Sequence, residues 1–235
     1  PLDERMFPPP EPKLPMIDAT GVTVRYGRNT PVLERADFRV HSGDFTFILG
    51  ASGSGKTTLL RLLFRDVAPV EGSVVVGGQN LQRLRGGKLA HFRRQVGFVF
   101  QDFKLLPRRT VAENIGLALR VTGAPRRHIR ERVDAILPRV GLEHRKNAYP
   151  QEISGGEQQR VAIARAMVGN PMILLADEPT GNLDPHLSVA ILDMFEGFHL
   201  RGTTVIIATH DTATAIERSK RVLRIEDRKV REGVR

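Results

Sequence analysis

The sequence predicts an α/β fold built around a mainly parallel central sheet. Three short runs are almost wholly apolar, as expected for strands buried on both faces: residues 45–49, 172–175 and 204–208. Each is followed along the chain by a stretch with the apolar spacing of a helix. A glycine-rich turn also joins the first of these strands to its helix. Buried strands that alternate with helices are typical of a parallel sheet covered by helices.

The other elements follow from local patterns. Residues 1–15 hold six prolines and no periodic pattern, which predicts a disordered tail. From Met16 to Val40 apolar and polar residues alternate in short runs, which indicates antiparallel strands. Further strands are expected at residues 74–76 and 96–100. Helices are expected at residues 56–65, within 111–146, at 154–166 and 187–198, with a final helix and strand after residue 208.

Composition sets limits but does not decide the function. The 235 residues and 26.2 kDa fit one globular unit, and the absence of cysteine excludes a disulfide-stapled miniprotein and a cysteine metal site. The longest apolar runs are four to six residues, against ~20 for a spanning helix, so we expect no bilayer span and no secretory signal peptide. The net charge of +10 fits nucleic acid, an anionic membrane surface, phosphate ligands or a merely solvated basic surface.

A phosphate-binding loop is the strongest motif. The pattern G-x-x-x-x-G-K-[ST] is matched in full by Gly50, Ala51, Ser52, Gly53, Ser54, Gly55, Lys56 and Thr57, with Thr58 next. It follows a buried strand and opens a helix, as the mechanism requires. Glycines let backbone N–H groups point inward toward an anion, and the helix N-terminus adds its dipole. Lys56 is expected to reach the β- and γ-phosphates of a nucleotide and Thr57 to ligate Mg²⁺.

Two acids, Asp177 and Glu178, end the apolar run that begins at Met172. Ligands of open parallel sheets bind beyond the carboxyl ends of the strands, so both acids are expected beside the phosphate loop. We expect Asp177 to hold Mg²⁺, directly or through water, and Glu178 to act as general base toward an attacking water. Taken alone, such a pair is also typical of residues that cap the next helix.

A second serine–glycine motif opens a helix at Ser154, Gly155, Gly156 and Glu157. With Ile153 before it, this segment resembles the LSGGQ signature of ABC-transporter ATPases. A helix N-terminus of this kind is another anion site, although serine–glycine loops are common. The resemblance implies that two copies pair head to tail, with each ATP held between one chain's phosphate loop and the other chain's signature. It covers residues 16 to about 228.

The resemblance assigns roles to four further residues. Tyr26 matches the aromatic residue that stacks on adenine, with packing at a strand edge as the alternative. Gln101 matches the glutamine that senses Mg²⁺ and the attacking water. Asp184 closes the loop that crosses the dimer interface, and His210 matches the histidine that contacts the γ-phosphate. The resemblance also implies one ABC ATPase domain over residues 16–235, with a P-loop (RecA-like) core, an antiparallel β subdomain and a helical subdomain at about 102–158.

A narrower resemblance rests on residues 100–106, 153–160 and 174–184. These are similar to the FtsE family of cell-division ATPases, which pair with the membrane protein FtsX. It implies an FtsX-like integral membrane subunit, bound through the segment Phe100–Leu106, whose apolar side chains suit an amphipathic helix. It also implies a peripheral location on the cytoplasmic face of the bacterial inner membrane, and ATP-driven closure that controls cell-wall hydrolysis.

Two other functions stay open at this point. ATPases of lipoprotein-releasing and MacB-type exporters share the run Pro-Thr-Gly-Asn-Leu-Asp at residues 179–184, which keeps a transport role as the alternative. A soluble ABC ATPase acting on nucleic acid or ribosomes is disfavoured. Such proteins usually fuse two ATPase domains or insert a long coiled coil, whereas this chain has one phosphate loop and no heptad run. We therefore expect no nucleic acid partner.

Overall fold

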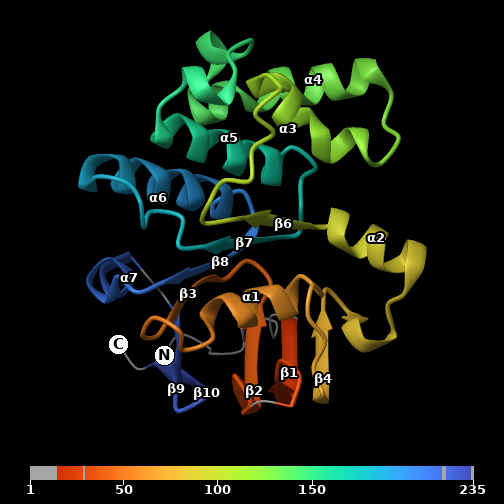
Figure 1. Ribbon diagram of the computed structural model, residues 1–235, viewed down its shortest axis with the longest axis vertical. Coiled ribbons are helices and arrows are strands. Elements are labelled where there is room, and N and C mark those ends of the chain that lie inside the picture. The colour runs from red at the N-terminus through yellow and green to blue at the C-terminus, as the bar shows by residue number, and fades with distance from the viewer. Residues whose placement is uncertain (1–14, 29, 219–220, 234–235) are drawn as a thin grey trace, which may run out of the picture.

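The computed structural model describes residues 15–28, 30–218 and 221–233 (Figure 1). The tail expected at residues 1–15 lies outside these ranges except for Pro15, which begins the first strand. Among the helices of the described ranges, none combines the length and apolar character that a bilayer span requires. The fold is the α/β arrangement that the apolar runs predict.

The central sheet has six strands in the order β10-β9-β3-β8-β7-β6. All neighbours are parallel except β10, which pairs with β9 as an antiparallel hairpin. The strands are β3 (Phe45–Leu49), β6 (Val96–Val99), β7 (Ile173–Asp177), β8 (Thr204–Thr209), β9 (Arg221–Glu226) and β10 (Lys229–Gly233). Since β3, β7 and β8 are neighbours, their carboxyl ends meet at one edge, and the motif residues that follow them are brought together there.

A second sheet is antiparallel and runs in the order β2-β1-β4-β5. It is formed by β1 (Pro15–Val24), β2 (Leu33–His41), β4 (Glu71–Val76) and β5 (Gln79–Asn80). Figure 1 shows it at the bottom, beneath α1 (Lys56–Leu63). This sheet therefore supports the helix that follows the phosphate loop.

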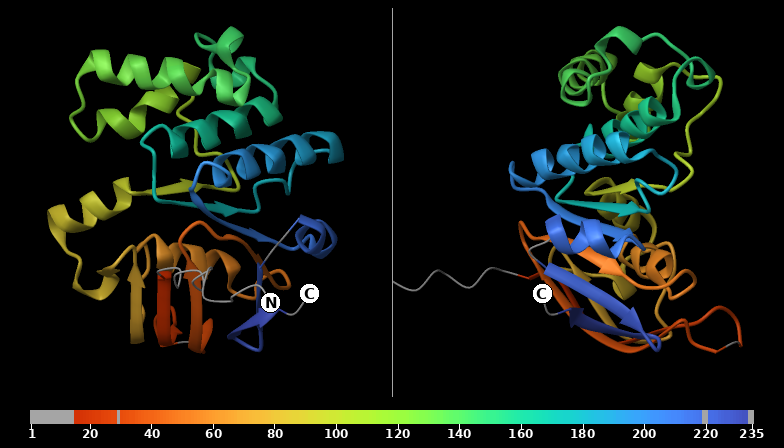
Figure 2. Two further views of the ribbon diagram at one scale, coloured as in Figure 1. Left: turned by 180° about the vertical axis from the view of Figure 1, so that it is seen from behind. Right: turned by 90° about the vertical axis from the view of Figure 1, so that its left-hand side faces the viewer.

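The remaining helices lie above and beside the central sheet (Figure 1, Figure 2). α3 (Val111–Arg120) and α4 (Arg126–Ile136) are at the top, α5 (Gly155–Met167) and α6 (Pro185–His199) lie between them and the sheet, and α2 (Gly86–Arg94) and α7 (Thr212–Arg218) flank it. Short 3₁₀ turns span Leu81–Arg83, Pro138–Val140, Glu143–Arg145 and Pro150–Glu152.

Alternate residues of the central strands serve two separate cores, because successive side chains of a strand point to opposite faces. Phe47, Leu174 and Ile207 pack with α3, α5 and α6 on one face. Ile48 and Leu175 pack on the other face with α1 and the antiparallel sheet. Burial on both faces explains why these strands are continuous apolar runs in the sequence.

Several sequence-based boundaries were wrong by one to three residues, and the helix expected at 56–65 shows why. Arg65 has a φ of 60°, outside the helical region, so α1 ends at Leu63. Similarly, β6 ends at Val99, β7 extends to Asp177, β1 begins at Pro15, and the strand expected at 74–76 begins at Glu71. The expected final helix and strand is a helix followed by two strands, and helix α2 was not expected at all.

Replacement of Gly97 by a larger residue should lower the stability of the protein substantially. A Cβ there would lie 2.7 Å from the carbonyl oxygen of Ala166 in α5 and 3.0 Å from Leu174 Cδ1. Backbone cannot move aside as a flexible side chain can, so we expect Gly97→Ala to lower the free energy of unfolding by about 1–3 kcal/mol. Urea denaturation measures this. The matched control is Gly197→Ala in α6, which has no atom within 4 Å of its Cβ and should be neutral or stabilising.

Candidate functional site

The phosphate loop curls tightly between β3 and α1, and two of its glycines are required by close approach. A Cβ on Gly50 would lie 2.4 Å from Ser54 Oγ and 3.0 Å from the carbonyl oxygen of Ile225. Gly55 has a φ of 109°, and its Cβ would lie 3.0 Å from a methyl group of Val32. The sequence pattern therefore has a direct steric cause at both positions.

The Lys56 side chain is buried at the base of this loop. Its ammonium donates hydrogen bonds to the carbonyl oxygens of Gly50 at 2.8 Å and Ala51 at 3.2 Å, and lies 3.5 Å from Glu178 Oε1. Only 7% of the residue is exposed. The loop thus holds a positive charge beside the end of β7, where the two acids are.

Thr57 and Asp177 face each other across this edge of the sheet. The Thr57 hydroxyl donates to Asp177 Oδ1 at 3.1 Å. Burial raises the pKa of the Asp177 carboxyl, and the Glu178 carboxylate raises it further, while the Thr57 hydrogen bond and Lys56 act in the opposite direction. A hydroxyl and one carboxylate are hard oxygen donors of the kind that Mg²⁺ uses together with phosphate oxygens, so this pair fits a magnesium ion.

Glu178 adopts an unusual backbone conformation, with a φ of 44°. Its N–H donates to the carbonyl oxygen of Ala208 at 2.9 Å, which fixes this turn against β8. His210 Nδ1 donates to Glu178 Oε2 at 3.0 Å, and the His210 backbone N–H approaches the same oxygen at 3.4 Å. Strain of this kind is found where surrounding structure enforces a functional geometry. The Glu178 carboxylate is thereby held between Lys56 and His210.

Apart from Asp177, which is buried behind Thr57 and does not line it, these side chains border a cavity of about 560 Å³. The sequence-predicted residues that line it are Ser52, Gly53, Gly55, Lys56, Thr57, Thr58, Gln101, Glu178 and His210, joined by Val32 and Gly181. Tyr26 stands at its edge, with its hydroxyl 3.3 Å from Thr58 Oγ1 and 41% of the residue exposed. Residues from five segments far apart in sequence are thus brought to one place, while their individual roles stay predictions.

The signature residues do not line this cavity. Ser154 is the N-cap of α5: its hydroxyl accepts from the Glu157 N–H at 3.2 Å, and Glu157 Oε2 accepts from the Ser154 N–H at 2.8 Å. Gly155 and Gly156 form the first turn of the helix. Asp184 is likewise outside the cavity and caps α6, accepting from the Leu187 N–H at 3.0 Å. Within one chain, the two predicted phosphate-binding devices are separate.

The sequence analysis missed three residues that support the site. Gln159 is fully buried and donates to the carbonyl oxygen of Pro179 at 2.8 Å, which ties α5 to the loop after Glu178. Arg145 donates to Glu157 Oε1 at 3.0 Å. Arg165 donates to the carbonyl oxygens of Phe103 and Lys104, each at 2.6 Å. None has a local sequence signal, because each partner is distant in sequence.

The Glu157 contacts predict a pH dependence of stability. Backbone and side-chain hydrogen bonds from Ser154, then the Arg145 guanidinium, lower the pKa of Glu157. When a carboxyl has a lower pKa in the folded chain than in the unfolded chain, its charged form stabilises the protein at pH values above the usual pKa of glutamate. This stabilisation is lost as the pH falls through the lowered pKa. Glu157→Gln should therefore lose less stability than the parent between neutral and acidic pH in urea unfolding. Equal losses in both chains would contradict this account.

The family model of the ABC transporter matches residues 33–181. The chain is 46% identical to the cell division ATP-binding protein FtsE of Streptococcus pneumoniae serotype 2 over 215 residues, covering 92% of this chain and 94% of that protein. It is 43% identical to the FtsE of Escherichia coli K12, covering 93% and 99%. A dimeric structure of the ATP-binding cassette MJ0796 in a post-hydrolysis state, bound to ADP and Pi, superposes with a TM-score of 0.83 at 35% identity, covering 93% of this chain and 98% of that one.

A phosphate loop and an acid pair at one edge of a parallel sheet, joined to an antiparallel sheet and a helical region, define an ATP-binding cassette. The chain belongs to the ABC transporter family and, within it, to the FtsE group of cell division ATP-binding proteins.

Proposed function

We propose that this chain hydrolyses ATP to ADP and phosphate in a head-to-tail dimer. One observation carries this proposal: the cavity gathers Lys56, Thr57, Glu178 and His210, whereas the signature residues Ser154–Glu157 lie elsewhere on the same chain. A second copy would bring its signature to the open side of the cavity. The similarity to a dimeric cassette bound to ADP and Pi supports both parts of the proposal.

Catalysis would rest on position and charge. The Lys56 ammonium would exchange its carbonyl partners for phosphate oxygens and offset the charge that develops on them. Glu178 Oε2 would accept a proton from the attacking water, with His210 orienting the carboxylate. Thr57, Asp177 and Gln101 would hold Mg²⁺, which when bound neutralises negative charge on the phosphates. The Ser154 hydroxyl and the first turn of α5 would hold the phosphates of the partner's nucleotide.

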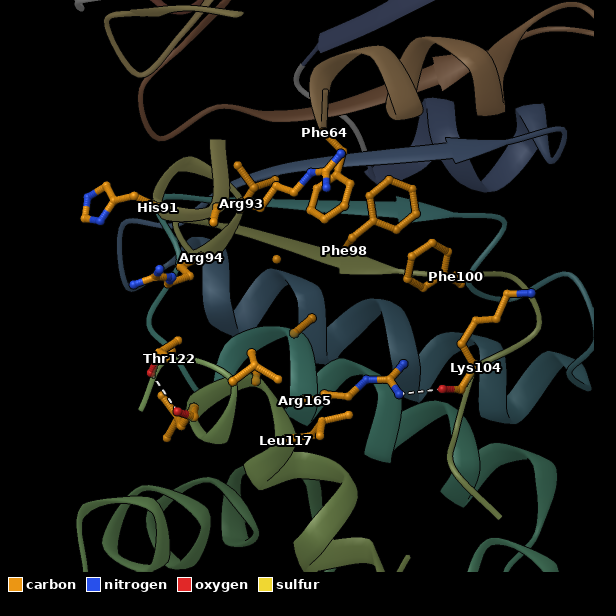
Figure 3. A pocket seen from close by; sticks show the side chains of 18 residues that line it. Phe64, His91, Arg93, Arg94, Phe98, Phe100, Lys104, Leu117, Thr122 and Arg165 are labelled. Atoms are coloured by element: carbon orange, nitrogen blue, oxygen red, sulfur yellow. Dashed lines mark hydrogen bonds between the residues drawn. The ribbon is translucent and has the colours of Figure 1, made fainter. Parts of the chain in front are cut away.

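A groove of about 850 Å³, shown in Figure 3, is separate from the nucleotide cavity but begins at the neighbouring residue. Phe100 lines this groove and the next residue, Gln101, lines the nucleotide cavity. Phe64, Phe98 and Phe100 lie along one side of the groove, and Arg165 and Leu117 lie along the other (Figure 3). We propose that this groove receives a helix of an FtsX-like integral membrane subunit, so that its movement is transmitted to the nucleotide.

The segment predicted to bind the partner lies partly along this groove, where Phe100 and Lys104 line it, and its role stays a prediction. Of its apolar residues, only Phe100 lines the groove. Phe100 packs against the core that includes α1, whereas Phe103 and Leu105 pack against the core on the other face of the sheet, and Leu106 is 41% exposed but not part of the groove. The reason is a sharp turn: Phe103 and Lys104 both have positive φ values, of 58° and 51°, which directs the following residues away.

We further propose the biological setting of the FtsE group. In this setting the chain lies on the cytoplasmic face of the bacterial inner membrane. ATP-driven closure of the dimer would pull on the membrane subunit and regulate cell-wall hydrolysis during division. The names of the relatives support the division role.

Affinity purification from detergent-solubilised membranes tests this setting. We expect an FtsX-like membrane protein to co-elute with the tagged chain, together with regulators of cell-wall hydrolases. A lipoprotein-releasing or exporter-type membrane subunit would instead favour the transport alternative. Phe100→Glu should abolish co-elution while ATP binding persists, because the groove and the cavity are separate. Co-elution of nucleic acid or ribosomes without any membrane protein would contradict the proposal.

A further inference from the structure

The surface around α2 is strongly basic. The sequence from Gly72 to Gln101 contains no Asp or Glu. The same stretch holds five cations that we call the α2 patch: Arg83, Arg85, Lys88, Arg93 and Arg94. Helix α2 projects from one side of the molecule in Figure 1 and again in the rear view of Figure 2. The patch is therefore presented outward rather than folded against an acidic surface.

The charge of the patch is not neutralised within the described part of the chain. On α4, by contrast, Arg127 is paired with Glu131 at 2.8 Å and Arg130 with Asp134 at 3.8 Å. No member of the α2 patch forms an ion pair with a carboxylate of the described ranges. Burial lowers the pKa of neighbouring Arg65, and the positive charges of Arg85 and Arg93 lower it further. The cations of this region therefore repel one another.

Two members of the patch hold α2 in place. Arg93 donates to the carbonyl oxygen of Arg65 at 3.0 Å, and its guanidinium lies 5.4 Å from the centre of the Phe64 ring. Arg85 donates to the carbonyl oxygens of Gln82 at 2.7 Å and Leu84 at 2.8 Å. These contacts explain why a short helix with one fully buried residue, Phe92, keeps its position.

The other three members are exposed and available. The side chains of Arg83, Lys88 and Arg94 form no hydrogen bond or ion pair with any residue in the described ranges. Arg94 also lines the groove, together with His91 and Arg93 (Figure 3). The proposed function assigns that groove to a membrane subunit, so its rim is expected to lie close to the bilayer surface.

We propose that the α2 patch binds the headgroups of anionic phospholipids and gives the chain an affinity for the membrane surface that does not need the membrane subunit. The orientation of the patch toward the bilayer rests on the proposed function, whereas the affinity itself rests on charge. Long, unpaired cations on a projecting helix complement a surface of phosphate headgroups, and each cation near such a surface strengthens binding about fivefold. This attraction weakens as salt screens it.

Vesicle co-sedimentation of the full chain tests the proposal, with vesicles of phosphatidylglycerol and phosphatidylcholine against phosphatidylcholine alone. We expect binding to the first only, and less of it at high salt. The variant R83Q/K88Q/R94Q removes three positive charges and none of the hydrogen bonds above. Its affinity should fall about a hundredfold, at about fivefold per charge. Circular dichroism and the thermal unfolding midpoint verify that it is folded.

A matched control distinguishes an effect of the α2 patch from an effect of the net charge of the whole chain. R126Q/R127Q/R130Q removes the same charge from α4, where Arg127 and Arg130 are paired with acids, and should lose less than tenfold. Equal losses in the two variants, or equal binding to both vesicle types, would overturn the proposal. The proposal would also be overturned if R83Q/K88Q/R94Q still bound the vesicles but no longer bound the membrane subunit. The patch would then contact protein and not lipid. Since vesicles contain no subunit and ATP is not hydrolysed, failure here leaves the proposed function standing.

Discussion

Glu178→Gln should reduce ATP turnover by between a hundredfold and ten-thousandfold while the chain still binds ATP and forms a dimer. The substitution keeps the shape of the side chain but removes the charge that would accept a proton from water, and general base catalysis contributes an effect of this size. The Glu178 carboxylate already lies 3.0 Å from His210 and 3.5 Å from Lys56, at the wall of the cavity. Phosphate release and size-exclusion chromatography with ATP and Mg²⁺ measure the two effects.

The matched control for this experiment is Glu131→Gln. Glu131 is in α4, pairs with Arg127 and lies outside the cavity, so turnover should be unchanged. Normal turnover in Glu178→Gln would remove this residue as the general base. Loss of ATP binding in the same variant would show instead that Glu178 mainly positions Lys56.

Lys56→Ala should act on an earlier step and weaken binding of the nucleotide. The ammonium is held within the loop by two carbonyl oxygens, so a positive charge is present at the loop before ATP arrives. Loss of one buried charge partner weakens binding by about 2–5 kcal/mol, which is a Kd raised about thirtyfold to several thousandfold. Equilibrium titration with a fluorescent ATP analogue measures this effect, and turnover should vanish with it.

Lys229→Ala is the matched control, because Lys229 is exposed in β10 and does not line the cavity. Its Kd should equal that of the parent. A Kd for Lys56→Ala within threefold of the parent would contradict the role of Lys56 in phosphate binding. Together Lys56→Ala and Glu178→Gln distinguish a defect in ATP binding from a defect in the chemical step.

The fold was predictable where burial leaves a local signature. The strands β3, β7 and β8 are buried on both faces and appear in the sequence as apolar runs. Helix α2 left no such signature, since only Phe92 is fully buried and its first two residues are Gly86 and Gly87. Its position depends on contacts between Arg93 and distant residues, which a local pattern cannot reveal.

The site was predictable to the extent that its residues form short motifs. Backbone geometry brings the residues that follow β3, β7 and β8 to one edge, so strand order places Lys56 beside Glu178. The residues that support the motifs were not predictable. Arg165 is an example: it holds the carbonyl oxygens of Phe103 and Lys104, some sixty residues earlier in the chain. Only tertiary packing specifies such a pair.

The central claim is that each nucleotide lies between the phosphate loop of one chain and the signature of another. Because the protein has no native cysteine, engineered cysteines report on this arrangement without background. Ser52 lines the cavity, and Gly155 begins α5 with open space around its Cβ. S52C and G155C, each made in the Glu178→Gln background, would supply one cysteine per chain.

The most direct measurement mixes these two variants with a short bismaleimide and follows cross-linking with and without ATP. We predict a product of about twice 26.2 kDa that forms only in the mixture and only with ATP. A product in either variant alone would indicate like-to-like pairing of the two chains. ATP-dependent dimers that give no S52C–G155C product would contradict the shared site.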